Sequence, residues 1–275
     1  MIKLLTKIFS ILLVTIILII IYLSLIGFKT ENFNEVISKK ILKNNSNINI
    51  KLKDVNFILS PLDFSINVKT YSPEIFIENK KLSLEFIASN IPLRSFFKEN
   101  FIIDDIKLST KFLKIRDVIA LSRIYNNSTE LLILNKIIKD GSIIADINLN
   151  FDESGKIKND YLIKGIVKDT KLRLLNSNKI ERLNFIFEMK YNQFNLRDIK
   201  TKFNQVPIVS SITEIQKKDK NFYINSKLKT NKKDFNFNMF NKIFKGELRK
   251  HGIKDMVFSS SSDISFLINE KFKIK

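Results

Sequence analysis

The sequence predicts a mainly β protein with a few short helices, in which an N-terminal transmembrane helix is followed by a curved antiparallel sheet. The segment Ile8–Phe28 has no charged side chain, and at ~1.5 Å rise per residue it spans roughly 31 Å, close to the ~30 Å hydrocarbon core of a bilayer. After Asn47, apolar residues recur at every second position in short runs separated by turn residues. This period is typical of an antiparallel meander with one wet face.

The apolar segment is predicted to be an uncleaved anchor. The alternative, a cleaved signal peptide, would have a shorter apolar run followed by small residues in an A-x-A pattern, but the first alanine is Ala88. Lysines lie on both sides of the segment, so positive charge does not decide its orientation. Because a short tail is easily left behind while a long domain crosses, we expect residues 1–7 to be cytoplasmic, residues 8–28 to span the membrane and the bulk to lie beyond it.

Two regions are expected after the anchor. Apolar residues at helical spacing predict a juxtamembrane helix within residues 29–45, and period-2 alternation predicts one β-rich domain over residues 46–275. Breaks in the alternation are expected at Ile91–Phe97, Ile115–Tyr125, Thr129–Ile138, Phe240–Lys250 and Ser259–Asp263. The first and fourth are expected as short helices, the second and third as two helices or a helix and a loop, and the last as a loop or helix cap.

The net charge of +19 and the pI near 9.8 first suggest nucleic acid or an anionic lipid surface as partner. Only seven of the 47 basic residues are arginine, the side chain that bidentate phosphate and base recognition favours. The lysines also alternate with apolar residues along the predicted strands instead of clustering. We therefore expect no nucleic-acid partner, and lipid headgroups beside the membrane are the more natural partner for this charge.

The residues that carry chemistry are scarce. One histidine, His251, lies in a turn context, and no cysteine is present, which excludes metal sites built from His or Cys clusters. Asp104 and Asp105 are adjacent in a strand, so their side chains point to opposite faces. The carboxylates around one turn could bind a cation loosely but lack calcium-loop spacing, namely Asp152, Glu153 and Asp160. We predict no catalytic, cofactor or metal residues and no enzymatic activity.

Phenylalanine is the most informative residue type, with 24 in the chain. Many occupy predicted inward-facing strand positions, where they form either an ordinary core or an open apolar groove for acyl chains. Alternation alone does not separate an open groove from a β-sandwich whose two sheets cover each other. The candidates for lipid-facing positions are Phe57, Phe64, Phe86, Phe185, Phe187 and Phe222.

Several segments resemble AsmA-like and TamB-like proteins. These segments are Ile48–Val55, Asn90–Phe97, Ile103–Leu108, Tyr161–Asp169, Ile180–Met189 and Phe194–Lys200. The resemblance covers most of the chain and implies a single-pass protein of the bacterial inner membrane whose β-groove projects into the periplasm. It also implies phospholipid acyl chains as cargo and a role in outer-membrane biogenesis, and it carries over no catalytic residue. At 275 residues the chain is much shorter than family members with a full groove.

A structural scaffold is the alternative function. The sequence stops at Phe272–Lys275 in strand-like alternation, without a closing proline or polar tail. An open last strand invites pairing, so a second hypothesis is that another envelope protein binds at this C-terminal edge.

Overall fold

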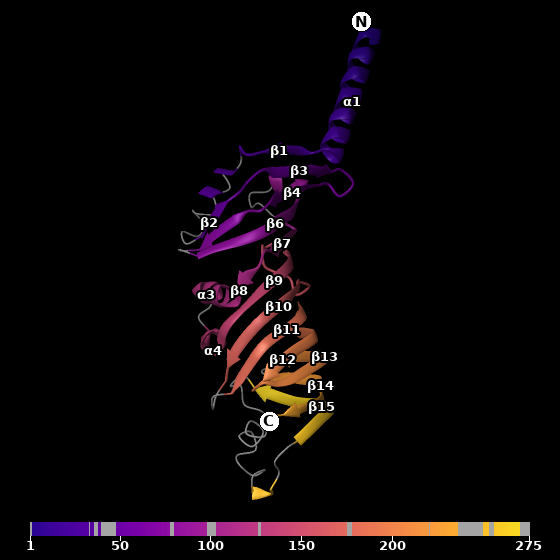
Figure 1. Ribbon diagram of the computed structural model, residues 1–275. Helices are drawn as coiled ribbons and strands as arrows, with labels where there is room; N and C mark the ends of the chain where they lie inside the picture. Colours follow the sequence, from indigo (N-terminus) through magenta and orange to yellow (C-terminus); the bar gives the residue numbers. More distant parts are fainter. Residues whose placement is uncertain are drawn as a thin grey trace. The chain divides into compact units, whose positions relative to one another are not determined.

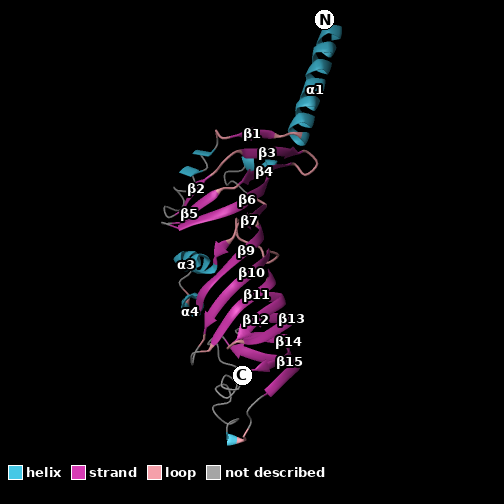
Figure 2. Ribbon diagram, viewed as in Figure 1, coloured by secondary structure: helices cyan, strands magenta, loops and turns pink. Residues whose placement is uncertain are grey.

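The computed structural model describes most of the chain (Figures 1 and 2). The described residues are 2–32, 34–35, 38–39, 48–77, 80–97, 103–125, 128–174, 178–219, 221–235, 250–252 and 256–269. The helices with stated bounds are α1 (Ile2–Leu25), the 3-10 helix η1 (Leu93–Phe97), α3 (Ile115–Tyr125) and α4 (Thr129–Ile137).

The strands form an antiparallel sheet. They are β1 (Phe28–Thr30), β2 (Ile48–Lys51), β3 (Val55–Ser60), β4 (Ser65–Tyr71), β5 (Glu74–Ile77), β6 (Lys80–Pro92), β7 (Asp105–Thr110), β8 (Leu113–Lys114), β9 (Ile138–Asn150), β10 (Leu162–Arg173), β11 (Lys179–Lys190), β12 (Gln193–Phe203), β13 (Val206–Lys218), β14 (Asn221–Phe235) and β15 (Met256–Asn269).

The sheet has 15 strands and is open, in the order β1-β3-β4-β6-β7-β9-β10-β11-β12-β13-β14-β15. Strand β2 pairs with β5, β5 also pairs with β6, and β8 pairs with β9. This confirms the predicted mainly β fold with an apolar N-terminal helix and an open sheet, and it does not show the alternative β-sandwich. Nearly all neighbours are consecutive in sequence, as expected of a meander.

The chain divides into two compact units. Unit 1 comprises Met1–Lys111 and Asp146–Tyr161, and unit 2 comprises Phe112–Ala145 and Leu162–Lys275. Strand β9 contributes its first part to unit 2 and its last part to unit 1.

The helices inside the β-rich region lie where the sequence predicts them. Helix α3 has the predicted bounds, α4 ends one residue earlier than predicted, and η1 follows Pro92. The α4 N-cap is Ser128, whose side chain accepts a hydrogen bond from the Leu131 amide at 3.4 Å, as serine commonly does at this position.

Two local predictions differ from the structure. Phe28–Thr30 form strand β1 across the expected boundary between the anchor and the juxtamembrane helix, and the described residues 34–35 and 38–39 are helical. Ser259–Asp263 lie inside β15, because their neighbours in β14 fix the register over the whole serine run. Apart from Lys250, the expected helix Phe240–Lys250 lies outside the described residues, as does the whole of Phe272–Lys275.

A row of β-bulges crosses unit 2. The register shifts near Asp169 in β10, Arg182 in β11 and Asp198 in β12, and each of these residues has a positive φ, between 49° and 53°. A further shift lies between Ser210 and Thr213 in β13. A bulge bends its strand and increases the local twist, so neighbouring bulges in four strands bend this part of the sheet.

Unit 1 has a buried apolar core. Its buried side chains include Val55 and Leu84, at 1% and 3% exposure, together with Ile50 in β2 and Ile77 in β5. The strand pair β2–β5 extends the sheet beside the first part of β6. Unit 2 also has buried apolar side chains, namely Ile119, Leu121, Ile138, Ala145, Val167 and Val206, but no described side chain of β11, β12 or β15 is buried.

Candidate functional site

The candidate site is the apolar face of unit 2, formed by strands β10 to β15. Side chains directly opposite each other on paired antiparallel strands lie on the same face. One cross-strand row is apolar on all six strands, running through Ile163, Met189, Phe194, Ile215, Ile224 and Phe266. We call this the apolar row, and it is continuous across all six strands.

The adjacent row on the other face of the same strands is polar. It runs through Lys164, Glu188, Asn195, Glu214, Asn225 and Ser265, and we call it the polar row. Glu188 accepts charge-assisted contacts from Lys190 Nζ at 2.9 Å and Lys164 Nζ at 3.4 Å. The hydrogen bond from Lys190 is the main cause that lowers the pKa of Glu188. The two rows therefore lie on opposite faces of these strands, although Lys217 lies on the face of the apolar row, opposite Phe222.

The side chains of the apolar row are half-buried. Among the described residues, helix α3 packs mainly on β8 and α4, and α4 reaches β10. Neither helix makes an extensive contact with β11 to β15. Other side chains on the same face are buried, namely Val167, Thr170, Val206, Ser210 and Thr213, so the apolar row is the less buried part of this face.

Gly165 makes room for an aromatic side chain on this face. It lies directly opposite Phe187, and a Cβ at Gly165 would lie 2.7 Å from Phe187 Cε1 and would also meet the Ile144 carbonyl oxygen. A glycine covered by a cross-strand aromatic ring is a known device of β-sheets. Phe187 also packs edge-on against Phe185, with ring centroids 6.3 Å apart.

A group of hydroxyls interrupts the apolar face at the bulge in β13. Thr213 Oγ1 and Ser226 Oγ lie 2.6 Å apart, and Ser210 Oγ donates to the Ile212 carbonyl oxygen at 2.8 Å. These hydroxyls hydrogen-bond to one another or to the backbone, so the bulge does not leave them as bare polar groups in an apolar surface.

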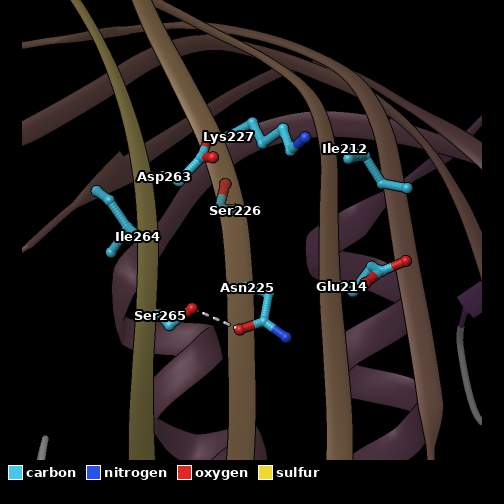
Figure 3. Close-up of a pocket in the computed structure, with 8 residues that line it drawn as sticks. All are labelled: Ile212, Glu214, Asn225, Ser226, Lys227, Asp263, Ile264 and Ser265. Carbon is cyan, nitrogen blue, oxygen red and sulfur yellow. Dashed lines mark hydrogen bonds between the residues drawn. The ribbon is translucent and has the colours of Figure 1, made fainter.

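A shallow depression of about 210 Å³ lies over β13 to β15, mostly on the polar face (Figure 3). Its lining includes the polar-row residues Glu214, Asn225 and Ser265, and Ser265 Oγ donates to Asn225 Oδ1 at 2.8 Å. Six of the eight lining residues are polar or charged, and the depression is open, unlike the enclosed apolar cleft of a typical small-molecule site.

Four of the six phenylalanine candidates lie on apolar faces. Phe185, Phe187 and Phe222 share the face of the apolar row in unit 2. In unit 1, Phe57 lies opposite Phe28, with ring centroids 6.5 Å apart, in a largely apolar cross-strand row.

The other two candidates lie elsewhere. Phe64 is not in a strand but ends the turn between β3 and β4, and its side chain is 73% exposed. Phe86 lies on the opposite face from Phe57, because the register shift between Leu84 and Phe86 inserts one residue and reverses the alternation. Its ring instead lies 4.6 Å from Lys69 Nζ. Both placements correct the predicted inward-facing positions.

The carboxylates and the histidine form no reactive constellation in the described ranges. Asp152 Oδ1 accepts hydrogen bonds from Ser154 and from the Lys156 amide, which lower its pKa and hold the turn. His251 is exposed in a turn. Among these residues, no group of three or more His, Cys, Asp or Glu side chains could hold a metal ion.

Helix α1 is the second feature with functional meaning. Lys3–Leu25 is the segment of the described chain that is long and apolar enough to cross a membrane, and its side chains are not buried by the rest of the protein. This property is shared by signal anchors and signal sequences. Comparisons with protein-family models, with curated proteins and with solved structures found no match.

Proposed function

We propose that this chain is a membrane-anchored, AsmA-like envelope protein that binds phospholipid acyl chains on the apolar face of unit 2 and supports outer-membrane biogenesis. The observation that carries the proposal is the apolar row across β10 to β15, whose six side chains are only half-buried. A sheet that only needed a core would bury such a row, since each buried CH₂ group gains about 0.8 kcal/mol.

Helix α1 would act as a single-pass anchor in a bacterial inner membrane, with its N-terminus in the cytoplasm and the β units in the periplasm. Its length and apolar composition support this role. The lysine-rich polar face of the sheet supports it as well, because an envelope protein beside anionic lipids gains from dispersed positive charge.

Bound phospholipid tests the proposal. The full chain is purified in mild detergent, and lipid phosphate per protein is measured with acyl chains identified by mass spectrometry. Phe187→Glu places a charge on the apolar face, while Ile186→Glu places the same charge on the opposite face of the same strand. Lipid that surrounds α1 contributes equally to both variants, so only lipid on the apolar face distinguishes them.

We expect Phe187→Glu to lose lipid relative to wild type and Ile186→Glu to retain it. The β-sheet circular dichroism of each variant controls for folding. Phe266→Glu and Leu267→Glu form a second matched pair in β15, on the two faces of one strand. Equal lipid content in both members of both pairs would contradict the proposal.

Pairing with another envelope protein through β15 is the second candidate function. Among the described strands, β15 pairs with β14 and forms one end of the sheet. Its 14 residues contain one charged side chain, Asp263, and no lysine or proline. Protected edge strands commonly carry such residues, so this edge is open to an added strand.

Site-specific crosslinking tests the edge. A photoreactive residue at the exposed Ser261 should form a protein adduct in intact cells. Adding the edge charges Ser259→Lys and Ser265→Lys should abolish the adduct, because lysine on an edge strand opposes pairing. An adduct that survives these charges, or no adduct at all, would contradict edge pairing.

A further inference from the structure

A cluster of large apolar side chains is exposed at one end of the sheet in unit 1. Leu62 is 94% exposed and Phe64 is 73% exposed, both in the turn between β3 and β4. Phe97 in η1 is 91% exposed, and its neighbour Phe96 is 57% exposed. We call these four residues the end patch. Single exposed apolar residues are common, but a cluster of this kind marks a contact surface.

Backbone pairing places the members of the end patch together. Ser65 and Pro92 lie directly opposite each other in β4 and β6, so the turn before Ser65 and the 3-10 helix after Pro92 lie at the same end of the sheet. The Leu93 amide donates to the Phe64 carbonyl oxygen at 2.7 Å, which joins the turn to η1 directly.

The same register places the end patch beside the exit of α1. Phe28 lies opposite Phe57 in the antiparallel pair β1–β3, so the last residues of α1 run alongside the end of β3 that leads into the turn. Figure 1 shows the turn after β3 near the end of α1. The end patch therefore lies at the level where the apolar helix stops.

Gly27 fixes this arrangement. It has φ +76°, and a Cβ there would lie 2.5 Å from the Phe57 carbonyl oxygen and 2.9 Å from Ile58 Cγ1. Only glycine tolerates both this backbone conformation and such a close approach. The helix exit thus rests directly against β3, without a free linker between them.

The backbone conformation at Phe64 is unusual for a phenylalanine. Phe64 has φ +48°, a conformation that is a genuine outlier for a bulky residue. The turn itself is well formed, because Ser60 Oγ donates to Asp63 Oδ2 at 2.7 Å and the Phe64 amide donates to the Pro61 carbonyl oxygen at 3.3 Å. Neither burial nor backbone preference favours phenylalanine here, and strained residues of this kind cluster at functional sites.

We infer that the end patch inserts into the headgroup and acyl boundary of the bilayer that α1 enters, as a second membrane contact next to the anchor. Apolar side chains of interfacial elements reach about 5–10 Å into this boundary. The bilayer is the occupant because the end patch is continuous with the end of the apolar helix. This inference rests on the proposed anchoring of α1.

Single tryptophans test the inference, because the chain contains none. The full chain is reconstituted in vesicles of phosphatidylcholine and phosphatidylglycerol whose acyl chains carry bromine near the headgroup. Phe64→Trp reports on the end patch, Tyr22→Trp reports on α1, and Tyr71→Trp is the matched control. Tyr71 is also exposed, but it lies at the other end of β4, roughly 23 Å away at ~3.3 Å per residue.

We expect bromolipid to quench Phe64→Trp nearly as strongly as Tyr22→Trp, with a blue-shifted emission, and to leave Tyr71→Trp almost unchanged. If Tyr22→Trp is quenched and Phe64→Trp behaves like Tyr71→Trp, the end patch does not enter the bilayer although the anchor stands. If Tyr22→Trp itself escapes quenching, the anchoring of α1 fails, and the inference fails with it. Leu62→Trp repeats the measurement should Phe64→Trp disturb the turn.

Discussion

The two units use the same alternating strands in different ways. In unit 1, apolar residues on β2, β3, β5 and β6 become buried, as Val55 and Leu84 illustrate. In unit 2, the long strands β11, β12 and β15 have no buried side chain among their described residues, although their rows are equally apolar. Elsewhere in unit 2 Val167 and Val206 are buried, so the difference concerns these three strands and is not announced by their alternating pattern.

Apolar residues at every second position therefore predict that a strand has an apolar face, but they do not predict what packs against that face. An apolar face can be buried by other parts of the protein, as in unit 1, or can remain accessible to another apolar molecule. The bulges near Asp169, Arg182 and Asp198 bend the strands of unit 2, and such bending favours a concave surface over a flat one that a second sheet could cover.

The largest expected effect separates the two units with one pair of leucines. Leu84→Ala in unit 1 removes a buried side chain and leaves a cavity, so it should lower the free energy of unfolding by about 2–5 kcal/mol. Leu196→Ala in unit 2 removes a half-buried side chain from the face of the apolar row. It should lower the free energy of unfolding by about 1–2 kcal/mol. Urea titration of the full chain in detergent, followed by pulse proteolysis, measures both.

An equal loss of unfolding free energy in the two variants would contradict this difference, since it would mean that Leu196 is as well packed as Leu84. The effect of added phospholipid on the free energy of unfolding gives a second comparison of the two proteins. Added phospholipid should stabilise wild type and should stabilise Leu196→Ala less, because the variant loses part of the proposed binding face.

A smaller effect is expected at Gly165. Gly165→Ala would push a methyl group against the Phe187 ring and the Ile144 carbonyl oxygen, and should lower the free energy of unfolding by about 1–3 kcal/mol through overpacking. Combining it with Phe187→Ala should give less than the sum of the two single costs, because the ring contact is then removed. Simple additivity in urea unfolding would show that Phe187 does not cover Gly165.

The smallest effect concerns the charged face. Lys190→Gln removes the main hydrogen bond to Glu188, so the pKa of Glu188 should rise toward its ordinary value. Since the folded-state pKa is lowered, the Glu188 contribution to stability is present above the unfolded-state pKa of about 4.3 and is lost as pH falls through the folded-state value. Carboxyl ¹³C NMR titration measures the shift, and Lys171→Gln, whose ammonium pairs with Asp140, is the control.

The sequence predicts the positions of the helices and strands better than it predicts on which face of the sheet a given side chain lies. Helices α3 and α4 and the 3-10 turn after Pro92 were predictable, because helical spacing and capping residues are local signals. The prediction of a loop or helix cap at Ser259–Asp263 is wrong, because pairing with β14 determines the structure there and a run of serines has no apolar alternation to indicate a strand.

The site was predictable only in part. Phe185, Phe187 and Phe222 lie on the apolar face because their strands keep the simple alternation there. Phe86 was misplaced because a bulge inserts one residue before it, and no local pattern announces a bulge without the partner strand. Phe64 looked like a strand residue, but its positive φ places it at the end of a turn.

The most direct test of the central claim is photocrosslinking at two adjacent aromatic residues of β14. Phe222 lies on the face of the apolar row, and Tyr223 lies on the face of the polar row. A photoreactive benzoyl-phenylalanine is placed at each position in turn in the full chain, in cells grown with labelled phosphate. The account predicts a phospholipid adduct at Phe222 and little or none at Tyr223, whereas equal labelling at the two positions or no adduct at Phe222 would contradict it.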